Sequence, residues 1–313
     1  MLYYILISVL LVTLELVYFR VADKFNIIDK PNERSSHTGI ILRGGGIIFY
    51  FGALVFSLFC CEYLWFTLGL TLISFISMVD DIRSVSQRIR LIFHFSAMAL
   101  MFYQWGLFAF PWWAVIAVLI VCTGIINAYN FMDGINGITG GGYSLVLLGV
   151  FCYVNEYVIS FVDSRMIGTM IIAVLIFCFF NFRKRAKCFA GDVGSVSIAF
   201  IILFLLGKLI LATGDFSWLI LLAVYGADTI LTIVHRIMLH ENIGLPHRKH
   251  LYQLMANELG VSHIGVAALY MVVQLAVAVF YLLYPGYMVF AVVCMVLLVF
   301  YIWFMKKYYH LHG

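Results

Sequence analysis

The sequence predicts an all-α membrane protein that crosses the bilayer about eleven times. Of its 313 residues, 65% are hydrophobic and only 11% are charged, whereas about a quarter of the residues in a soluble domain are charged. The apolar residues gather in runs of about 20, the length that a helix needs to cross a hydrocarbon core of about 30 Å. So few polar residues cannot cover a water-facing surface, and we expect the bilayer to surround most of the chain.

Eleven apolar runs are the expected spans, and no soluble domain, linker or internal repeat interrupts them. The whole chain, residues 1–313, is therefore expected to form one integral membrane domain. The first run has no basic segment before it and no small-residue cleavage site after it, which favours a retained helix over a removed signal peptide. The spans are residues 2–21, 44–61, 63–79, 91–104, 110–126, 138–154, 166–182, 193–213, 216–235, 262–283 and 287–304.

Basic residues predict which helix ends face the cytoplasm. If successive spans alternate in direction, 17 of the 19 Lys and Arg residues lie beside loops on one side. Positive charge stays cytoplasmic, so we expect the N-terminus outside, the C-terminus inside and five internal loops in the cytoplasm. The net charge of +4 by itself gives no indication of a nucleic-acid partner. All of the clustered acids, amides and imidazoles fall on the same predicted cytoplasmic side.

Two adjacent carboxylates, Asp80 and Asp81, end the third span. Such neighbours repel each other unless a positive group lies close by. A divalent cation, a substrate cation or a basic side chain would serve, and Arg88 and Arg90 follow within ten residues. The pair therefore indicates a cation site, a local salt bridge or two solvated loop acids.

The fifth span leads into a run of amides, an acid and glycines. Amide and carboxylate groups are donors and acceptors suited to the edge of a uracil or ribose, and glycines let the backbone approach a ligand closely. The alternative is an ordinary turn between two membrane helices. The residues are Asn127, Asn130, Asp133, Gly134, Asn136 and Gly137.

A third acidic position, Asp192, lies between two glycines where the eighth span begins. An aspartate at the start of a helix is typical of an N-cap residue. It is equally suited to Mg²⁺, which proteins hold through one or two carboxylates with phosphate and water completing the shell.

The longest inner loop carries His247, Arg248, Lys249 and His250. Two histidines three apart suggest zinc, but there is no neighbouring Cys and no H-E-x-x-H pattern. A run so rich in donors suits a diphosphate better, and an interfacial amphipathic helix is the structural alternative. Earlier, Arg43 precedes Gly44–Gly46, which is no P-loop and indicates close helix packing or a hinge.

Acids, basic groups and amides without a Cys or Ser nucleophile motif fit Mg²⁺-assisted phosphoryl chemistry. Five ordered motifs resemble those of the polyprenyl-phosphate N-acetylhexosamine-1-phosphate transferases, glycosyltransferase family 4. The resemblance extends over the whole chain and implies a bundle of ten or eleven helices with a cytoplasmic active-site cleft. The motifs are Asp29–His37 with Arg43–Gly46, Asp80-Asp81, Asn127–Gly137, Phe189–Ser195 and His247–Gln253.

The resemblance implies that a (deoxy-)N-acetylhexosamine-1-phosphate passes from a UDP-sugar to undecaprenyl phosphate, with release of UMP. It implies that Asp192 binds Mg²⁺, with Mn²⁺ as an alternative metal, and that Asp80 and Asp81 act on the lipid phosphate, one as a base. His247 and His250 would contact the diphosphate. The substrate-binding residues would be Asn127, Asn130, Asp133, Asn136, Phe189, Arg88, Arg90 and Arg248. Such an enzyme lies in the bacterial inner membrane among membrane lipids, and a homodimer is compatible with it.

Two departures from the family pattern bear on the substrate. Asn136 stands where the family often has the second aspartate of Asp-Gly-x-Asp-Gly. The histidine motif reads His-Arg-x-His-x-Tyr-Gln, which resembles the O-antigen and capsule branch, including enzymes that use QuiNAc or FucNAc donors. The alternatives are a UDP-GlcNAc enzyme of another cell-wall polymer, a membrane transporter, whose polar groups lie near the bilayer midplane, and a scaffold subunit.

Overall fold

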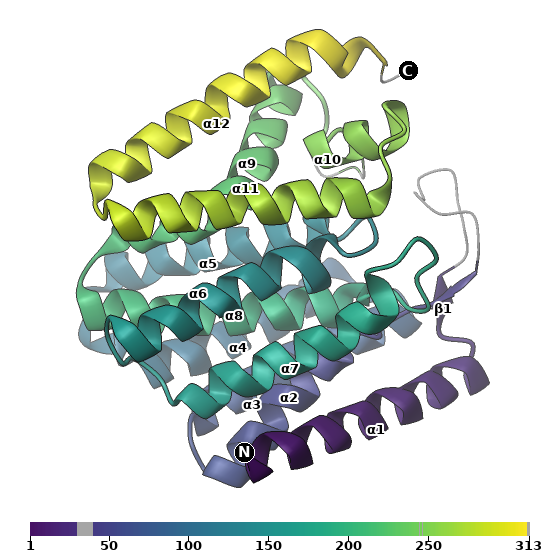
Figure 1. Cartoon of the computed structure of the whole chain (residues 1–313), viewed down its shortest axis with the longest axis vertical. Helices are drawn as coiled ribbons and strands as arrows, with labels where there is room; N and C mark the ends of the chain where they lie inside the picture. Colours follow the sequence, from purple (N-terminus) through teal and green to yellow (C-terminus); the bar gives the residue numbers. More distant parts are fainter. Residues whose placement is uncertain (30–39, 244, 246, 312–313) are drawn as a thin grey trace.

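A computed structural model of the chain describes residues 1–29, 40–243, 245 and 247–311. Apart from one two-residue β-ladder, this part consists of helices and short connections (Figure 1). The long helices are α1 (Leu2–Lys24), α2 (Ile47–Cys60), α3 (Leu64–Ile82), α4 (Gln87–Trp105), α5 (Trp112–Met132), α6 (Ser144–Tyr157), α7 (Ser164–Asn181), α8 (Gly191–Thr213), α9 (Ala223–Met238), α11 (His263–Leu283) and α12 (Tyr287–Tyr308).

Within the described residues, nine helical segments are long and apolar enough to cross a membrane. One of them joins the π-helix η2 (Ile138–Tyr143) to α6, and another joins the 3-10 helix η3 (Phe216–Leu222) to α9. The shorter α2 and the polar-ended α4 also match predicted spans. Each of the eleven predicted runs therefore corresponds to one helical segment. The prediction of an all-α, multi-pass membrane protein is confirmed.

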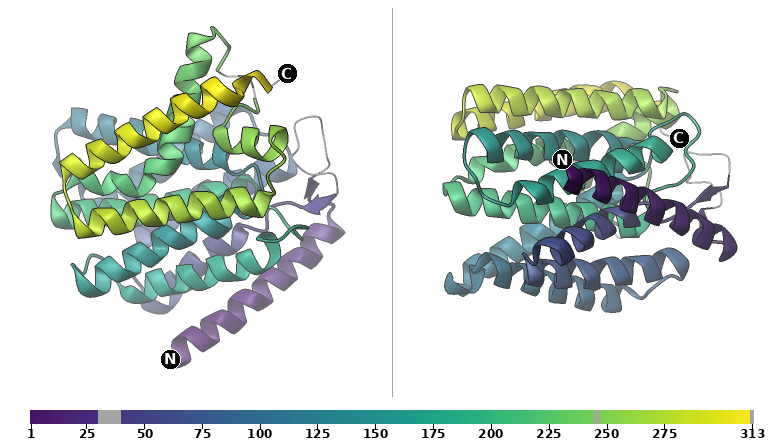
Figure 2. Two further views of the ribbon diagram at one scale, coloured as in Figure 1. Left: turned by 45° about the horizontal axis from the view of Figure 1, so that its top comes forward. Right: turned by 60° about the horizontal axis from the view of Figure 1, so that its bottom comes forward.

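The helices alternate in direction, so the odd and even connections gather at opposite ends of the bundle. The N-terminus lies at the end away from β1 and α10 (Leu251–Gln253), as Figures 1 and 2 show. At that far end, the Asp163 N–H donates to the Tyr63 hydroxyl at 3.0 Å. The connections predicted to be cytoplasmic share the other end, where the β-ladder of β1 (Ile28–Asp29) and β2 (Ile41–Leu42) also lies.

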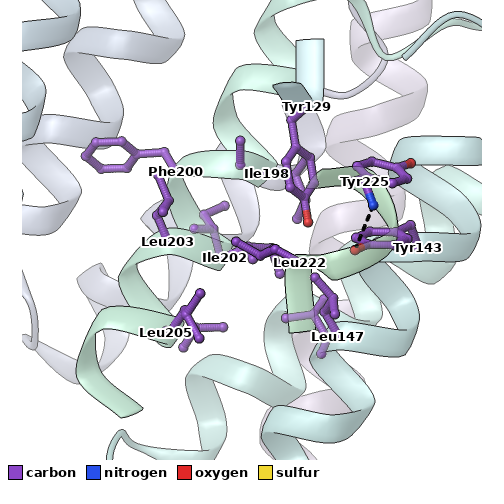
Figure 3. Close-up of a cluster of buried hydrophobic side chains, with 14 of the residues drawn as sticks. Tyr129, Tyr143, Leu147, Ile198, Phe200, Ile202, Leu203, Leu205, Leu222 and Tyr225 are labelled. Atoms are coloured by element: carbon purple, nitrogen blue, oxygen red, sulfur yellow. Dashed lines mark hydrogen bonds between the residues drawn. The ribbon is translucent and has the colours of Figure 1, made fainter. Parts of the chain in front are cut away.

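Helix α8 is the centre of the bundle. It packs against α2, α3, α5 and α6, and all its side chains from Val193 to Leu206 are buried. A helix that is apolar all round its circumference belongs in such an interior. Figure 3 shows α8 side chains beside a cluster of buried tyrosines, in which Tyr143 and Tyr225 stack with ring centroids 3.6 Å apart. The start of α8 is consequently a fixed platform at one end of the molecule.

The glycines that follow Arg43 allow close helix packing, one of the two roles predicted from the sequence. A Cβ atom on Gly46 would lie 2.4 Å from the Cα of Gly194 in α8. Gly45 and Gly46 also donate backbone N–H bonds to the carbonyls of Phe189 and Ala190. This contact brings Arg43 to the start of α8.

Candidate active site

Asp81 anchors the start of α8. Its side chain is completely buried, and its two oxygens accept the backbone N–H groups of Asp192 and Val193, each at 2.9 Å. The first N–H groups of a helix have no partner within that helix, and a carboxylate satisfies them well because the helix dipole is positive there. Asp81, at the end of α3, thereby fixes the position of Asp192.

Arg43 joins this arrangement from the first inner loop. Its Nε lies 2.6 Å from Asp81 Oδ1, and its Nη2 lies 3.5 Å from Asp192 Oδ1. Burial alone would lower the pKa of Arg43, but the carboxylates of Asp81 and Asp192 outweigh it and raise the pKa. The guanidinium is therefore a permanent positive charge beside the acids. The sequence placed Arg43 in a motif without giving it a role.

Asp80 turns away from Asp81 and faces the connection to α4. It accepts the Val85 N–H at 2.6 Å and pairs with Arg90 at 2.9 Å. Its carboxyl group also lies close enough to Asp192 for the two side chains to interact. The exposed fractions are 11% for Asp80 and 20% for Asp192, against 0% for Asp81. A ligand can therefore reach Asp80 and Asp192 but not Asp81.

Asp133 approaches the same acids from the end of α5. Burial, reinforced by the charge of Asp192, raises the pKa of Asp133 to about 7. The turn that follows is fixed by the buried Asn181, whose Oδ1 accepts the Gly137 N–H at 2.7 Å and whose Nδ2 donates to the Cys188 carbonyl at 2.8 Å. One buried amide thus ties the turn after α5 to the segment before α8.

Gly137 occupies a position that other residues cannot take. Its φ is +81°, and an added Cβ would lie 1.8 Å from a ring carbon of Phe182. Gly137→Ala should lower the free energy of unfolding by about 2–4 kcal/mol, from the left-handed backbone and the overpacking together. Thermal unfolding in detergent measures this. Gly149→Ala is the control, because no atom lies within 4 Å of its added Cβ, and equal losses in both variants would contradict the prediction.

The histidine segment, His247–Gln253, lies beside the end of α5. The ring of His250 lies near those of Phe131 and Tyr252, with centroid distances of 6.3 and 5.8 Å. The Tyr252 hydroxyl donates to the Phe131 carbonyl at 2.8 Å, two residues before Asp133. The four connections after α3, α5, α7 and α9 therefore meet at one end of the bundle.

His247 is half-buried and has one defined tautomer when neutral. Its Nδ1 accepts the Lys249 N–H at 3.3 Å, so the proton of the neutral ring is on Nε2. Burial, followed by the effect of His250, lowers the pKa of His247 to about 4. At neutral pH the ring is an uncharged donor through Nε2–H, which suits a phosphoryl oxygen.

Several predicted site residues are placed differently from the sequence expectation. Asp81, Asn136 and His250 are almost fully buried; Asn136 donates to the Arg183 carbonyl at 3.0 Å, so all three hold the site rather than line it. The others are accessible: Asn127 and Arg88 are exposed, and Asn130, Phe189, Arg90 and Arg248 are half-buried. Residues 30–37 of the first motif lie outside the described residues.

The accessible acids suit a magnesium ion held jointly with a phosphate. In the described part of the chain, no group of three His, Cys, Asp or Glu side chains is arranged to hold a metal by itself. Mg²⁺ takes one or two carboxylates and fills its shell with phosphate oxygens and water. Asp192 would provide such a carboxylate, and Asp80, Arg43 and Arg90 lie beside it.

Fold and site together define a multi-pass membrane protein whose acids, arginines and histidines converge at one end of a helical bundle. The model of glycosyl transferase family 4 matches residues 63–210 of this chain. This confirms the family indicated by the motifs.

Relatives with assigned functions extend the match. A probable undecaprenyl-phosphate N-acetylglucosaminyl 1-phosphate transferase of Bacillus subtilis is 28% identical over 294 residues, covering 85% of this chain and 79% of the relative. The undecaprenyl-phosphate α-N-acetylglucosaminyl 1-phosphate transferase of Escherichia coli is 30% identical over 230 residues, covering 64% of this chain. The chain spans 60% of the length of that second relative.

Proposed function

We propose that the protein transfers an N-acetylhexosamine-1-phosphate, in a deoxy or non-deoxy form, from a UDP-sugar to undecaprenyl phosphate. UMP leaves, and the lipid-linked product begins an O-antigen or capsule glycan. The observation that carries the proposal is the meeting of two accessible acids, Asp80 and Asp192, with Arg43 and Arg90 at one end of a membrane bundle. A lipid phosphate and a soluble nucleotide can both reach such a position.

In the proposed reaction, an oxygen of the lipid phosphate attacks the β-phosphorus of the UDP-sugar in line. The bond from that phosphorus to the bridging oxygen breaks, and UMP takes the electron pair. Asp80 accepts the proton of the lipid phosphate if one is present, and Arg43 and Arg90 hold the phosphates in position. His247 donates Nε2–H to a diphosphate oxygen. Mg²⁺, held by Asp192, would neutralise charge on the diphosphate. Asp81 is assigned a positioning role because its oxygens already bind α8.

Two versions of this proposal differ in the sugar that the donor carries. The histidine motif supports a deoxy-N-acetylhexosamine and the O-antigen or capsule branch. The relatives support N-acetylglucosamine as the sugar, because the two described above are named for N-acetylglucosaminyl 1-phosphate transfer. Asn136 does not separate the two versions, since its side chain is buried against the Arg183 carbonyl.

We expect detergent-solubilised protein to label undecaprenyl phosphate from one of several UDP-N-acetyl sugars when Mg²⁺ is present. The measurement is radiolabel in the extracted lipid together with release of UMP. Added UMP should reverse the labelling, and chelation of Mg²⁺ should abolish it. Exchange of UDP-sugar across a sealed vesicle without any labelled lipid would instead identify a transporter. Proteolysis of sealed vesicles tests the cytoplasmic placement of the site and of the C-terminus.

A further inference from the structure

A buried carboxylate in α9, Asp228, holds the start of α10, directly after His250. Its Oδ1 accepts the Leu251 N–H at 2.9 Å, and its Oδ2 accepts the Tyr252 N–H at 3.3 Å. Two hydroxyl groups complete its surroundings: Tyr270 donates to Oδ2 at 2.6 Å and Thr232 donates to Oδ1 at 3.2 Å. Only 3% of Asp228 is exposed. This is the same construction as at α8, where Asp81 accepts two consecutive N–H groups directly after Gly191.

Asp228 also faces the imidazole of His250. The distance from its Oδ1 to His250 Nδ1 is 3.4 Å, and both side chains are almost fully buried. Both ring nitrogens of His250 are buried, and among the described residues neither has a hydrogen-bond partner of good geometry. The Asp228 carboxylate therefore lies against the edge of the imidazole and, through the N–H groups of Leu251 and Tyr252, holds the backbone that carries it.

The ring of His250 connects this buried pair to the accessible part of the site. The His247 ring lies over it, with centroids 4.9 Å apart and a tilt of 35°. Of the two histidines, His247 is half-buried and His250 is buried, so His247 is the imidazole that reaches solvent and ligand. A change in the orientation of His250 would therefore move His247.

We infer that Asp228 is a positioning residue of the active site: it fixes the orientation of His250 and so aligns the histidine segment with the diphosphate. This inference rests on the proposed function, because the consequence is read through the transfer reaction. A carboxylate that serves only to join helices would stabilise the fold without any special connection to His250. The two roles differ in how the effects of substitutions combine.

Asp228→Asn keeps the size of the side chain and removes its charge. We expect kcat for UMP release to fall by about a hundredfold, a typical loss when a group that orients a reacting histidine is changed. The KM for the UDP-sugar should remain within about threefold, because Asn127, Asn130 and Asp133 are untouched. Loss of binding without loss of kcat would overturn the inference.

The decisive comparison is a double-mutant cycle with His250→Gln. The glutamine amide reaches the position of Nε2 but has no counterpart of Nδ1, so it cannot use Asp228. If Asp228 acts through His250, the double variant should be no slower than the slower single variant. Losses that multiply would show two independent roles and would overturn the inference.

Asp215→Asn is the matched structural control. Asp215 also accepts a backbone N–H at a helix start, from Ser217 at 2.8 Å, but it follows the far end of α8, about 35 Å along the helix from Asp192. The Asp215→Asn substitution should lower the melting temperature and leave kcat within about twofold.

If the Asp228→Asn protein does not fold, Asp228→Glu replaces it. Failure of both variants to fold would mean that Asp228 has a purely structural role and would overturn the inference. An inactive wild-type protein would refute the proposed function, whereas an active one with a normal Asp228→Asn would refute only this inference.

Discussion

Asp192→Ala should reduce the rate of UMP release by about a thousandfold or more. Loss of a metal-held charge in a phosphoryl transfer removes several kcal/mol of transition-state stabilisation, and each 1.4 kcal/mol is a factor of ten in rate. The variant should still fold, because the bond that fixes the start of α8 is made by the backbone N–H of residue 192 and not by its side chain.

The measurement is initial UMP release in detergent as the Mg²⁺ concentration is varied. Asp192→Asn is the companion variant, since an amide keeps the shape but binds Mg²⁺ far less well than a carboxylate. Melting curves of both variants should match the wild type within a few degrees. Turnover near the wild-type rate in either variant would refute the metal role of Asp192.

Asp81→Ala should destabilise the folded active site and not only lower the reaction rate. The substitution removes the acceptor of two helix N–H groups and leaves the charge of Arg43 without its closest partner. Breaking a buried pair by removal of one member typically lowers the free energy of unfolding by about 3–5 kcal/mol. Activity should disappear at temperatures where the wild type is still folded.

Thermal and denaturant unfolding in detergent test this second expectation. Asp163→Ala is a suitable control, because Asp163 caps α7 and pairs with Arg165 at the other end of the bundle. Loss of that cap should lower the free energy of unfolding by only about 1 kcal/mol. An Asp81→Ala protein as stable as Asp163→Ala would contradict the role assigned to the buried carboxylate.

The helices could be predicted because the bilayer dictates a simple pattern. A membrane span must be apolar and about 20 residues long, so α1, α8, α11 and α12 are visible as continuous runs. The alternation of these runs also placed the polar connections at one end. The structure supports that common end through Arg43, Asp81 and Asp192, which come from the first inner loop, the end of α3 and the start of α8.

The supporting residues could not be predicted in the same way. Asp228 stands within the apolar run of α9, and Asn181 ends α7 beside aromatic residues. Neither residue lies in a cluster of polar residues in the sequence. Their importance comes from partners more than 20 residues away, the N–H groups of Leu251 and Gly137. Such pairings exist only after the helices have packed.

The amino-acid sequence by itself determined that this is an all-α, multi-pass membrane protein and indicated its family, because hydrophobicity and short motifs are local properties. Only the tertiary structure decided which of the two adjacent acids, Asp80 and Asp81, is buried and which is accessible. Asp81 turns into the bundle to hold α8, and Asp80 faces the accessible side. The adjacent positions of the two acids in the sequence do not predict this difference, because burial and hydrogen-bond partners depend on the helices packed around each side chain.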